Sequence, residues 1–304
     1  TQTHPRPGCT RAGGRRNRHA QPTPVLATTK PGQSQTLTRA VYTTSRSVRT
    51  SQTHTGAVTP LESIRWAADL GYDFIELYMD GSSERTGLDR EAIAAALEET
   101  GVGCLVHLPF VDLDLGTPRN KVREGSIREL RACLDVAAAL GAEKAVLHAS
   151  THATEPEWSE RTTKPRILAS VRELEGYATA RGIELCVENL PDDVYSIRTI
   201  QEVLAETDAS LTVDTGHARV SGFSASDTAA FLNEHRDRVS HVHINDARQA
   251  RDEHVPVGSG TTDFETILAP LADGWNGTFS VEAYTFDKDY MRLSKEKLDA
   301  CLST

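Results

Sequence analysis

The sequence predicts an α/β fold, a (β/α)₈ or TIM barrel, over residues 55–304. Eight short apolar runs alternate with longer segments of helical periodicity, and helix start and stop signals separate them. Eight such βα units in about 250 residues match the size of this barrel. An open doubly wound sheet is the alternative. That fold usually has a glycine-rich turn after its first strand, whereas the turn here reads Val58-Thr-Pro60.

The predicted strands are short apolar runs bounded by polar or glycine residues. In chain order they are Thr55–Val58, Phe74–Tyr78, Cys104–His107, Ala145–His148, Glu184–Glu188, Leu211–Asp214, Val239–Ile244 and Thr278–Glu282. In a parallel barrel all strands end at the same rim, and that rim carries the active site. The residues that end the strands are therefore the first candidates for chemistry.

Capping residues predict where the helices between these strands begin and end. Two examples are the amphipathic helices expected at Arg119–Leu140 and Pro165–Ala180. Capping boxes, in which an acidic residue follows a Ser or Thr by three positions, are predicted at Thr59–Glu62, Ser224–Asp227 and Thr262–Glu265. Helix ends are predicted at Gly101, Gly141 and Gly182.

Residues 1–54 differ from the rest of the chain in composition and charge. They contain eight Arg and one Lys but no Asp or Glu, and they are rich in Thr, Ser, Gln, Pro and Gly. We therefore predict a disordered basic segment, followed by a catalytic domain at residues 55–304. The segment resembles an organellar transit peptide, or it lies upstream of the working protein. The acidic body of the chain favours the second interpretation.

Residues 55–304 carry 24 Lys and Arg against 43 Asp and Glu, a formal charge of −19, with only six Lys. Such a surface suggests a halophilic protein and argues against a nucleic-acid partner. No run approaches the roughly 18 apolar residues of a membrane span. The five cysteines form no CxxC pair, and Cys104 and Cys186 lie in apolar runs. A cytoplasmic location therefore fits better than a disulfide-forming compartment.

Ionisable residues end six consecutive predicted strands. They are His107, His148, Glu188, Asp214, His243 and Glu282. Such groups are costly at the ends of apolar strands unless they are paired or bind a metal. Mixed carboxylates and imidazoles suit a divalent metal such as Mn, Zn, Co or Mg. A lone histidine is more often structural, and we interpret His241 in this way, while His152 and His235 are expected at the surface.

The segment after the seventh strand holds further candidates. Asp252 and His254 could add metal ligands from a loop, and Arg248 could hold a substrate oxyanion or hydroxyl. Gly258-Ser-Gly260 precedes a helix, where TIM barrels often bind a phosphate. A plain turn with an N-cap is the favoured interpretation of these glycines.

These motifs resemble those of the xylose-isomerase-like barrel superfamily, which includes sugar (phosphate) isomerases and epimerases, such as D-tagatose 3-epimerase, and endonuclease IV. The matching pieces are Val-Glu188-Asn, Val-Asp214-Thr-Gly-His217-Ala, His-Val-His243-Ile-Asn-Asp, Asp252-Glu-His254-Val-Pro-Val-Gly-Ser-Gly260 and Val-Glu282. For an epimerase, the resemblance implies one divalent metal and four ligands, Glu188, Asp214, His243 and Glu282. It also implies that the two glutamates are the catalytic acid and base, and that His217 and Arg248 contact substrate.

The same resemblance leaves a nuclease alternative open. Endonuclease IV holds three zinc ions, and its additional ligands match His107, His148, His217, Asp252 and His254. The chain departs from both patterns after Glu188. It lacks the glycine-rich run of the nuclease, and Val194 stands where the epimerases place a further glutamate.

The expected function is that of a metal-dependent isomerase or epimerase of a sugar or sugar phosphate. The metal would polarise a carbonyl group, and Glu188 and Glu282 would move a proton between faces or neighbouring carbons. The alternatives are an endonuclease IV-like multi-zinc phosphodiesterase, a dehydratase or other lyase on the same barrel, and a non-catalytic binding barrel. The barrel is also a candidate homo-oligomer.

Overall fold

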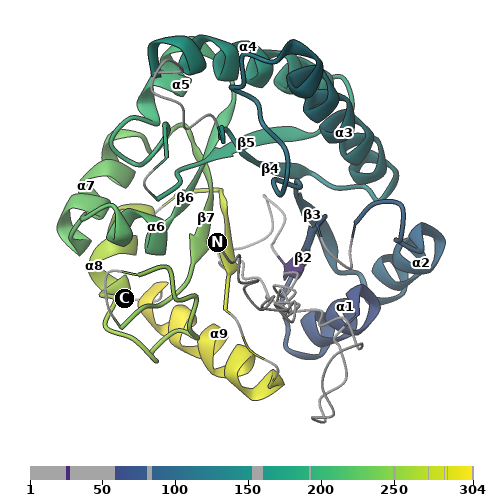
Figure 1. The fold of residues 1–304 in the computed structure, drawn as a ribbon. Coiled ribbons are helices and arrows are strands. Elements are labelled where there is room, and N and C mark those ends of the chain that lie inside the picture. Colours follow the sequence, from purple (N-terminus) through teal and green to yellow (C-terminus); the bar gives the residue numbers. More distant parts are fainter. Residues whose placement is uncertain are drawn as a thin grey trace, which may run out of the picture.

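The computed structural model describes residues 25–27, 59–80, 84–152, 160–191, 193–248, 251–272, 274–283, 285 and 287–302. Its strands follow one another in sequence order and curl around a central axis, with the helices outside them (Figure 1). Within the described ranges, seven parallel strands form a nearly closed barrel, so the predicted fold class is confirmed. They are β2 (Phe74–Tyr78), β3 (Gly103–His107), β4 (Lys144–His148), β5 (Glu184–Glu188), β6 (Ser210–Asp214), β7 (Val239–Ile244) and β8 (Thr278–Val281).

These seven strands confirm the predicted positions to within one residue at either end. The remaining predicted strand, Thr55–Val58, lies outside the described residues. Instead, the short strand β1 (Val25–Ala27) pairs antiparallel with β2. This short apolar run covers the open backbone edge of β2, and the disorder of residues 1–54 stays a prediction. The rest of that segment lies outside the described residues.

The helices fill the connections between the strands. They are α1 (Pro60–Asp69), α2 (Arg90–Thr100), α3 (Asn120–Ala139), α4 (Glu160–Thr179), α5 (Gln201–Glu206), α6 (Thr215–Val220), α7 (Ala225–Glu234), α8 (Phe264–Leu268), a 3₁₀ turn η2 (Ala269–Leu271) and α9 (Lys288–Leu302). The capping boxes that begin α1 and α7, at Thr59 and Ser224, are confirmed. Gly101, Gly141 and Gly182 have the positive φ angles expected where helices end.

Two helix starts differ from the predictions. The N-cap of α8 is Asp263 rather than Thr262, because the Asp263 carboxylate accepts the backbone N–H of Thr266 at 3.1 Å. Helix α4 begins at Glu160, before Pro165, which lies inside the helix. The acidic side chain of Glu160 suits the first helical turn and pairs with Lys164 at 3.2 Å.

Successive side chains of each strand point alternately outward and inward, so that apolar side chains form an outer layer and polar ones line the interior of the barrel. On β2, Ile75 and Leu77 pack in the hydrophobic core, whereas the carboxylate of Glu76 contacts His241 inside the barrel. The same period of two brings the last inward residue of the strands to one rim. The thiols of Cys104, Cys133 and Cys186 are free and buried, and no helix of the described chain is long and apolar enough to cross a membrane.

Candidate metal centre

Nine ionisable side chains converge at the carboxyl-terminal rim of the barrel. The strands β3 to β6 end in His107, His148, Glu188 and Asp214, and the first turn of α6 adds His217. Strand β7 adds His243, Glu282 follows β8 directly, and the loop after β7 adds Asp252 and His254. Their potential ligand atoms form three groups, each compact enough to hold a metal ion: His107, His148 and Glu188; Glu188, Asp214, His243 and Glu282; His217, Asp252 and His254.

Glu188 lies at the junction of these groups. Its Oε2 atom is 3.2 Å from His107 Nε2 and 3.0 Å from His148 Nε2. Its Oε1 atom is 3.2 Å from His243 Nδ1 and 3.3 Å from His217 Nδ1. Burial opposes ionisation of this carboxyl, but His243 and His148 outweigh it and hold its pKa well below the usual range. Glu188 therefore has the position and charge of a bridging ligand.

Asp214 is held in a fixed orientation by its neighbours. Its carboxylate accepts the backbone N–H of His217 at 2.5 Å and the side-chain N–H of Asn245 at 2.7 Å. Asn189 bonds both the backbone N–H and the backbone carbonyl of Asp214. Residue 216 has to be glycine here, because a Cβ on Gly216 would lie 1.9 Å from Asn245 Oδ1.

The third group depends on the loop after β7. Asp252 approaches two histidines, with Oδ1 at 2.7 Å from His254 Nε2 and Oδ2 at 3.4 Å from His217 Nε2. His254 Nδ1 lies 3.4 Å from Glu282 Oε2, so this residue also contacts the second group. His254 has a φ angle of 46°, a backbone conformation that is rare outside glycine and concentrates at functional sites.

The chemistry of these side chains fits divalent metal ions. Carboxylates and imidazoles are ordinary ligands of such ions, and eight of the nine side chains lie largely out of solvent. Glu282 Oε2 is buried and accepts no hydrogen bond from the described residues, although two imidazole nitrogens lie within 3.5 Å. Burial, with the charge of Asp214 adding to it, raises the pKa of Glu282 to about 7.

Arg248 and the glycines after it have partners within the loop that follows β7. The Arg248 side chain is 65% exposed and pairs with Glu253 at 2.9 Å. The backbone N–H groups of Gly258 and Gly260 both donate to the carboxylate of Asp246. This internal carboxylate occupies the position that a phosphate would need, so a plain structural turn is the better interpretation of the glycines.

Sequence reasoning missed Glu76, a fully buried carboxylate on β2 that bonds His241 and His243 below the rim. The available signal was a single charged residue in the apolar run Phe-Ile-Glu-Leu-Tyr, at an inward position. His241, interpreted from the sequence as structural, is also fully buried, with Thr278 on its Nδ1 side at 2.5 Å.

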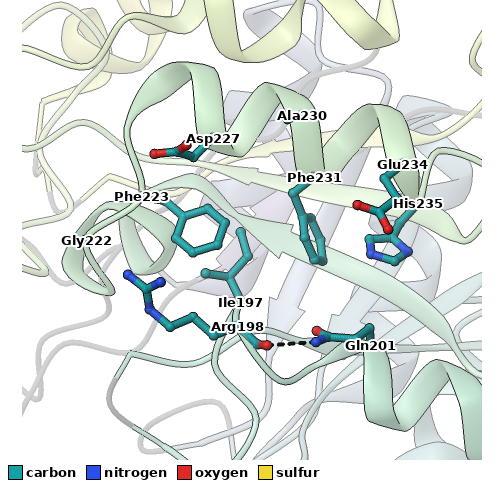
Figure 2. A pocket seen from close by; sticks show the side chains of 10 residues that line it. All are labelled: Ile197, Arg198, Gln201, Gly222, Phe223, Asp227, Ala230, Phe231, Glu234 and His235. Atoms are coloured by element: carbon teal, nitrogen blue, oxygen red, sulfur yellow. Dashed lines mark hydrogen bonds between the residues drawn. The ribbon is translucent and has the colours of Figure 1, made fainter.

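A separate surface pocket lies beside α7, outside the barrel (Figure 2). Phe223 and Phe231 line its apolar part, and Arg198 and Glu234 lie at its edges. None of the nine rim residues lines this pocket, so it is not part of the candidate metal centre.

Comparisons with known proteins place these residues in a family context. The family model described as xylose isomerase-like TIM barrel matches residues 64–301, a span that includes Glu76 and all nine rim residues. An uncharacterised protein of Methanocaldococcus jannaschii is 26% identical over 169 residues, which is 55% of this chain and 64% of that protein. A probable endonuclease 4 of Mycobacterium marinum is 23% identical over 254 residues, covering 80% of this chain and 98% of that protein.

Solved structures show the same fold. A D-tagatose 3-epimerase-like protein superposes with a TM-score of 0.69 at 24% identity, over 80% of this chain and 92% of that chain. A Thermus thermophilus protein, whose crystal was soaked with zinc chloride, has a TM-score of 0.59 at 26% identity, over 77% of this chain and 92% of that chain. At 24% identity, the similarity to the first structure shows the fold alone. The chemistry of the site therefore depends on its side chains.

Proposed function

The chain belongs to the xylose isomerase-like TIM barrel family, and from that premise we propose that it is a metal-dependent hydrolase of phosphate esters. One observation carries the proposal: the nine rim side chains form three potential metal-binding groups. Glu188 belongs to two of them and lies 3.3 Å from His217 of the third. The single-metal site predicted from the resemblance to epimerases needs only the second group. Clustered divalent ions are typical of enzymes that cleave phosphate esters, where they stabilise both the attacking and the leaving oxygen.

The nine residues would hold the ions, and five of them are histidines, which favours zinc or a similar transition metal over magnesium. When bound, these ions supply Lewis acidity and neutralise the charge of phosphate oxygens. Glu188 remains ionised and holds the groups together. Glu282 would complete the second group, where a bound ion would lower the pKa of about 7 that this carboxyl has in the metal-free protein.

A sugar isomerase or epimerase is the second candidate. It is favoured by Glu282, whose raised pKa suits an acid/base role, and by the resemblance of the fold to a D-tagatose 3-epimerase-like protein. Under this alternative Glu188 is the partner of Glu282 in proton transfer. One set of contacts argues against it: histidines engage both oxygens of Glu188.

Substrate assays with ligand variants separate the two candidates. The zinc-loaded and manganese-loaded full chain is assayed with bis(p-nitrophenyl) phosphate, with duplex DNA containing an abasic site, and with a panel of ketoses. We expect phosphate ester hydrolysis that falls at least about 100-fold in His148→Asn and in His254→Asn, because each removes a ligand outside the four-residue group. Turnover of a ketose that both variants retain would instead support the epimerase and reject the hydrolase.

A further inference from the structure

Glu76 is a buried carboxylate that neither proposed reaction uses. It lies on β2, which pairs with β3, and its side chain is fully buried in the barrel interior. An ionised group in such a place is costly unless several partners bond it. The identity of those partners shows what the residue does.

The partners of Glu76 connect it to the second metal group. Its Oε1 atom lies 3.3 Å from His243 Nε2. Its Oε2 atom accepts the hydroxyl of Ser280 at 2.5 Å and lies 3.0 Å from His241 Nε2. On the opposite side of the His243 ring, Nδ1 faces the rim, 3.2 Å from Glu188 Oε1 and 3.5 Å from Glu282 Oε2.

We propose that Glu76 is a positioning residue: it accepts the Nε2–H of His243 and so fixes the ring with Nδ1 toward the metal ligands. A neutral imidazole carries its proton on one nitrogen only, and a carboxylate acceptor at Nε2 selects the tautomer whose Nδ1 lone pair is free to bind a metal. The inference rests on the metal-binding part of the proposed function.

The same three side chains, Glu76, His241 and His243, are close enough to bind an ion of their own. The hydrogen-bond pattern favours the positioning role. A neutral His241 that donates from Nε2 to Glu76 and accepts the hydroxyl of Thr278 at Nδ1 satisfies both of its nitrogens. With Ser280 donating to the same carboxylate, the network is complete with protein groups alone.

Chelator competition on the full chain tests the proposal. Zinc dissociation constants are measured for the wild type and for Glu76→Gln, in which a weaker neutral acceptor replaces the carboxylate. We expect zinc binding to weaken about 10–100-fold, the usual effect of losing such a partner. The cobalt(II) absorption bands should also shift, which a loss of stability alone would not cause.

Asp114→Asn is the matched control. Asp114 is a largely buried carboxylate that accepts the N–H groups of Gly116 and Thr117 and the hydroxyl of Thr151. It contacts none of the nine rim side chains in the described structure. Its variant should lose stability but keep the wild-type zinc affinity and cobalt spectrum.

The remaining outcomes are distinguishable. Unchanged zinc affinity and an unchanged cobalt spectrum in folded Glu76→Gln would overturn the positioning role alone, whereas a wild type that binds no divalent ion would overturn the proposed function with it. A stoichiometric extra ion lost only in Glu76→Gln would show that Glu76 is itself a ligand and overturn the positioning role.

If the variant does not fold, ¹⁵N spectra of the zinc-loaded wild type decide the question. A His243 ring protonated at Nε2 supports the proposal, and one protonated at Nδ1 overturns it.

Discussion

Among single residues, Glu188 connects the candidate metal groups, because each of its two oxygens lies close to two histidines. Neither a shorter nor an uncharged side chain could make the same contacts. A shorter carboxylate would not reach both sides, and a neutral amide would place N–H groups against imidazole nitrogens that have to face a cation.

Glu188→Gln should lose the ions of two groups and weaken the overall affinity for zinc more than about 100-fold, beyond the loss expected for a residue outside the ligand set. Zinc affinity by chelator competition measures the effect. The control is Glu184→Gln on the same strand, where Glu184 pairs with Ser210 at the opposite end of the barrel. Equal affinity in Glu188→Gln and the wild type would contradict the bridging role.

The stability of the metal-free protein should depend on pH through the protonation of His254. Although burial opposes the shift, Glu282 and Asp252 raise the pKa of His254 to about 9, above its ordinary value of 6.5. The pairing therefore stabilises the fold fully below about pH 6.5 and is lost as the pH rises through about 9.

Melting temperatures of EDTA-treated protein between pH 6 and 9.5 measure this loss, which should be smaller in His254→Gln. If the melting temperature falls with pH equally in the variant and the wild type, the loss of stability at alkaline pH comes from other groups and the role of His254 is wrong.

At the scale of elements, the loop after β7 is fixed by Asp246. Its carboxylate accepts four backbone N–H groups, those of Ala247, Gly258, Gly260 and Thr262, at 2.8–3.0 Å. Residues 246 and 255 also form a backbone bridge. The segment between them carries Asp252 and His254, so this anchor determines where the third group lies.

Asp246→Asn should loosen this loop, because an amide offers one acceptor oxygen to N–H groups that now share two. We expect the third group to lose its ion first, lowering the bound zinc by about one per chain while the other groups stay loaded. Elemental analysis after gel filtration measures this. Glu253→Gln in the same loop weakens the pairing with the exposed Arg248 and leaves the four N–H groups on Asp246 in place, so it should bind zinc as the wild type does. Identical metal content in Asp246→Asn would refute the anchoring role.

The sequence predicted the strands and helix caps better than it predicted individual side-chain contacts. Apolar runs and capping signals are local, so the seven parallel strands and the caps at Thr59 and Ser224 could be placed from the sequence. The rim residues followed from topology, because parallel strands end together. The partners of Glu76 and Arg248 could not be predicted, since they depend on which side chains face each other across the barrel or within a loop. The antiparallel β1 was missed for the same reason, as its pairing is non-local.

At the scale of the whole molecule, the acidic charge of residues 55–304 leads to a prediction about salt. Residues 55–304 carry a formal charge of −19. Such a surface repels itself at low ionic strength, and salt shortens the range of that repulsion from about 10 Å at 0.1 M to about 3 Å at 1 M. The melting temperature should therefore rise as KCl is increased from 0.1 to 2 M at constant pH. A melting temperature that stays constant or falls would reject the proposal that the protein is adapted to high salt.

The number of divalent ions bound per chain distinguishes a multinuclear centre from a single-metal site. The full chain is loaded with excess zinc, freed of loose metal by gel filtration, and measured by elemental analysis against protein concentration. The three groups around Glu188 predict two to three ions per chain, with fewer in His148→Asn and in His254→Asn. A single ion, unaffected by these two substitutions and abolished by Glu188→Gln, would contradict the multinuclear centre and leave the single-metal isomerase or epimerase as the better account.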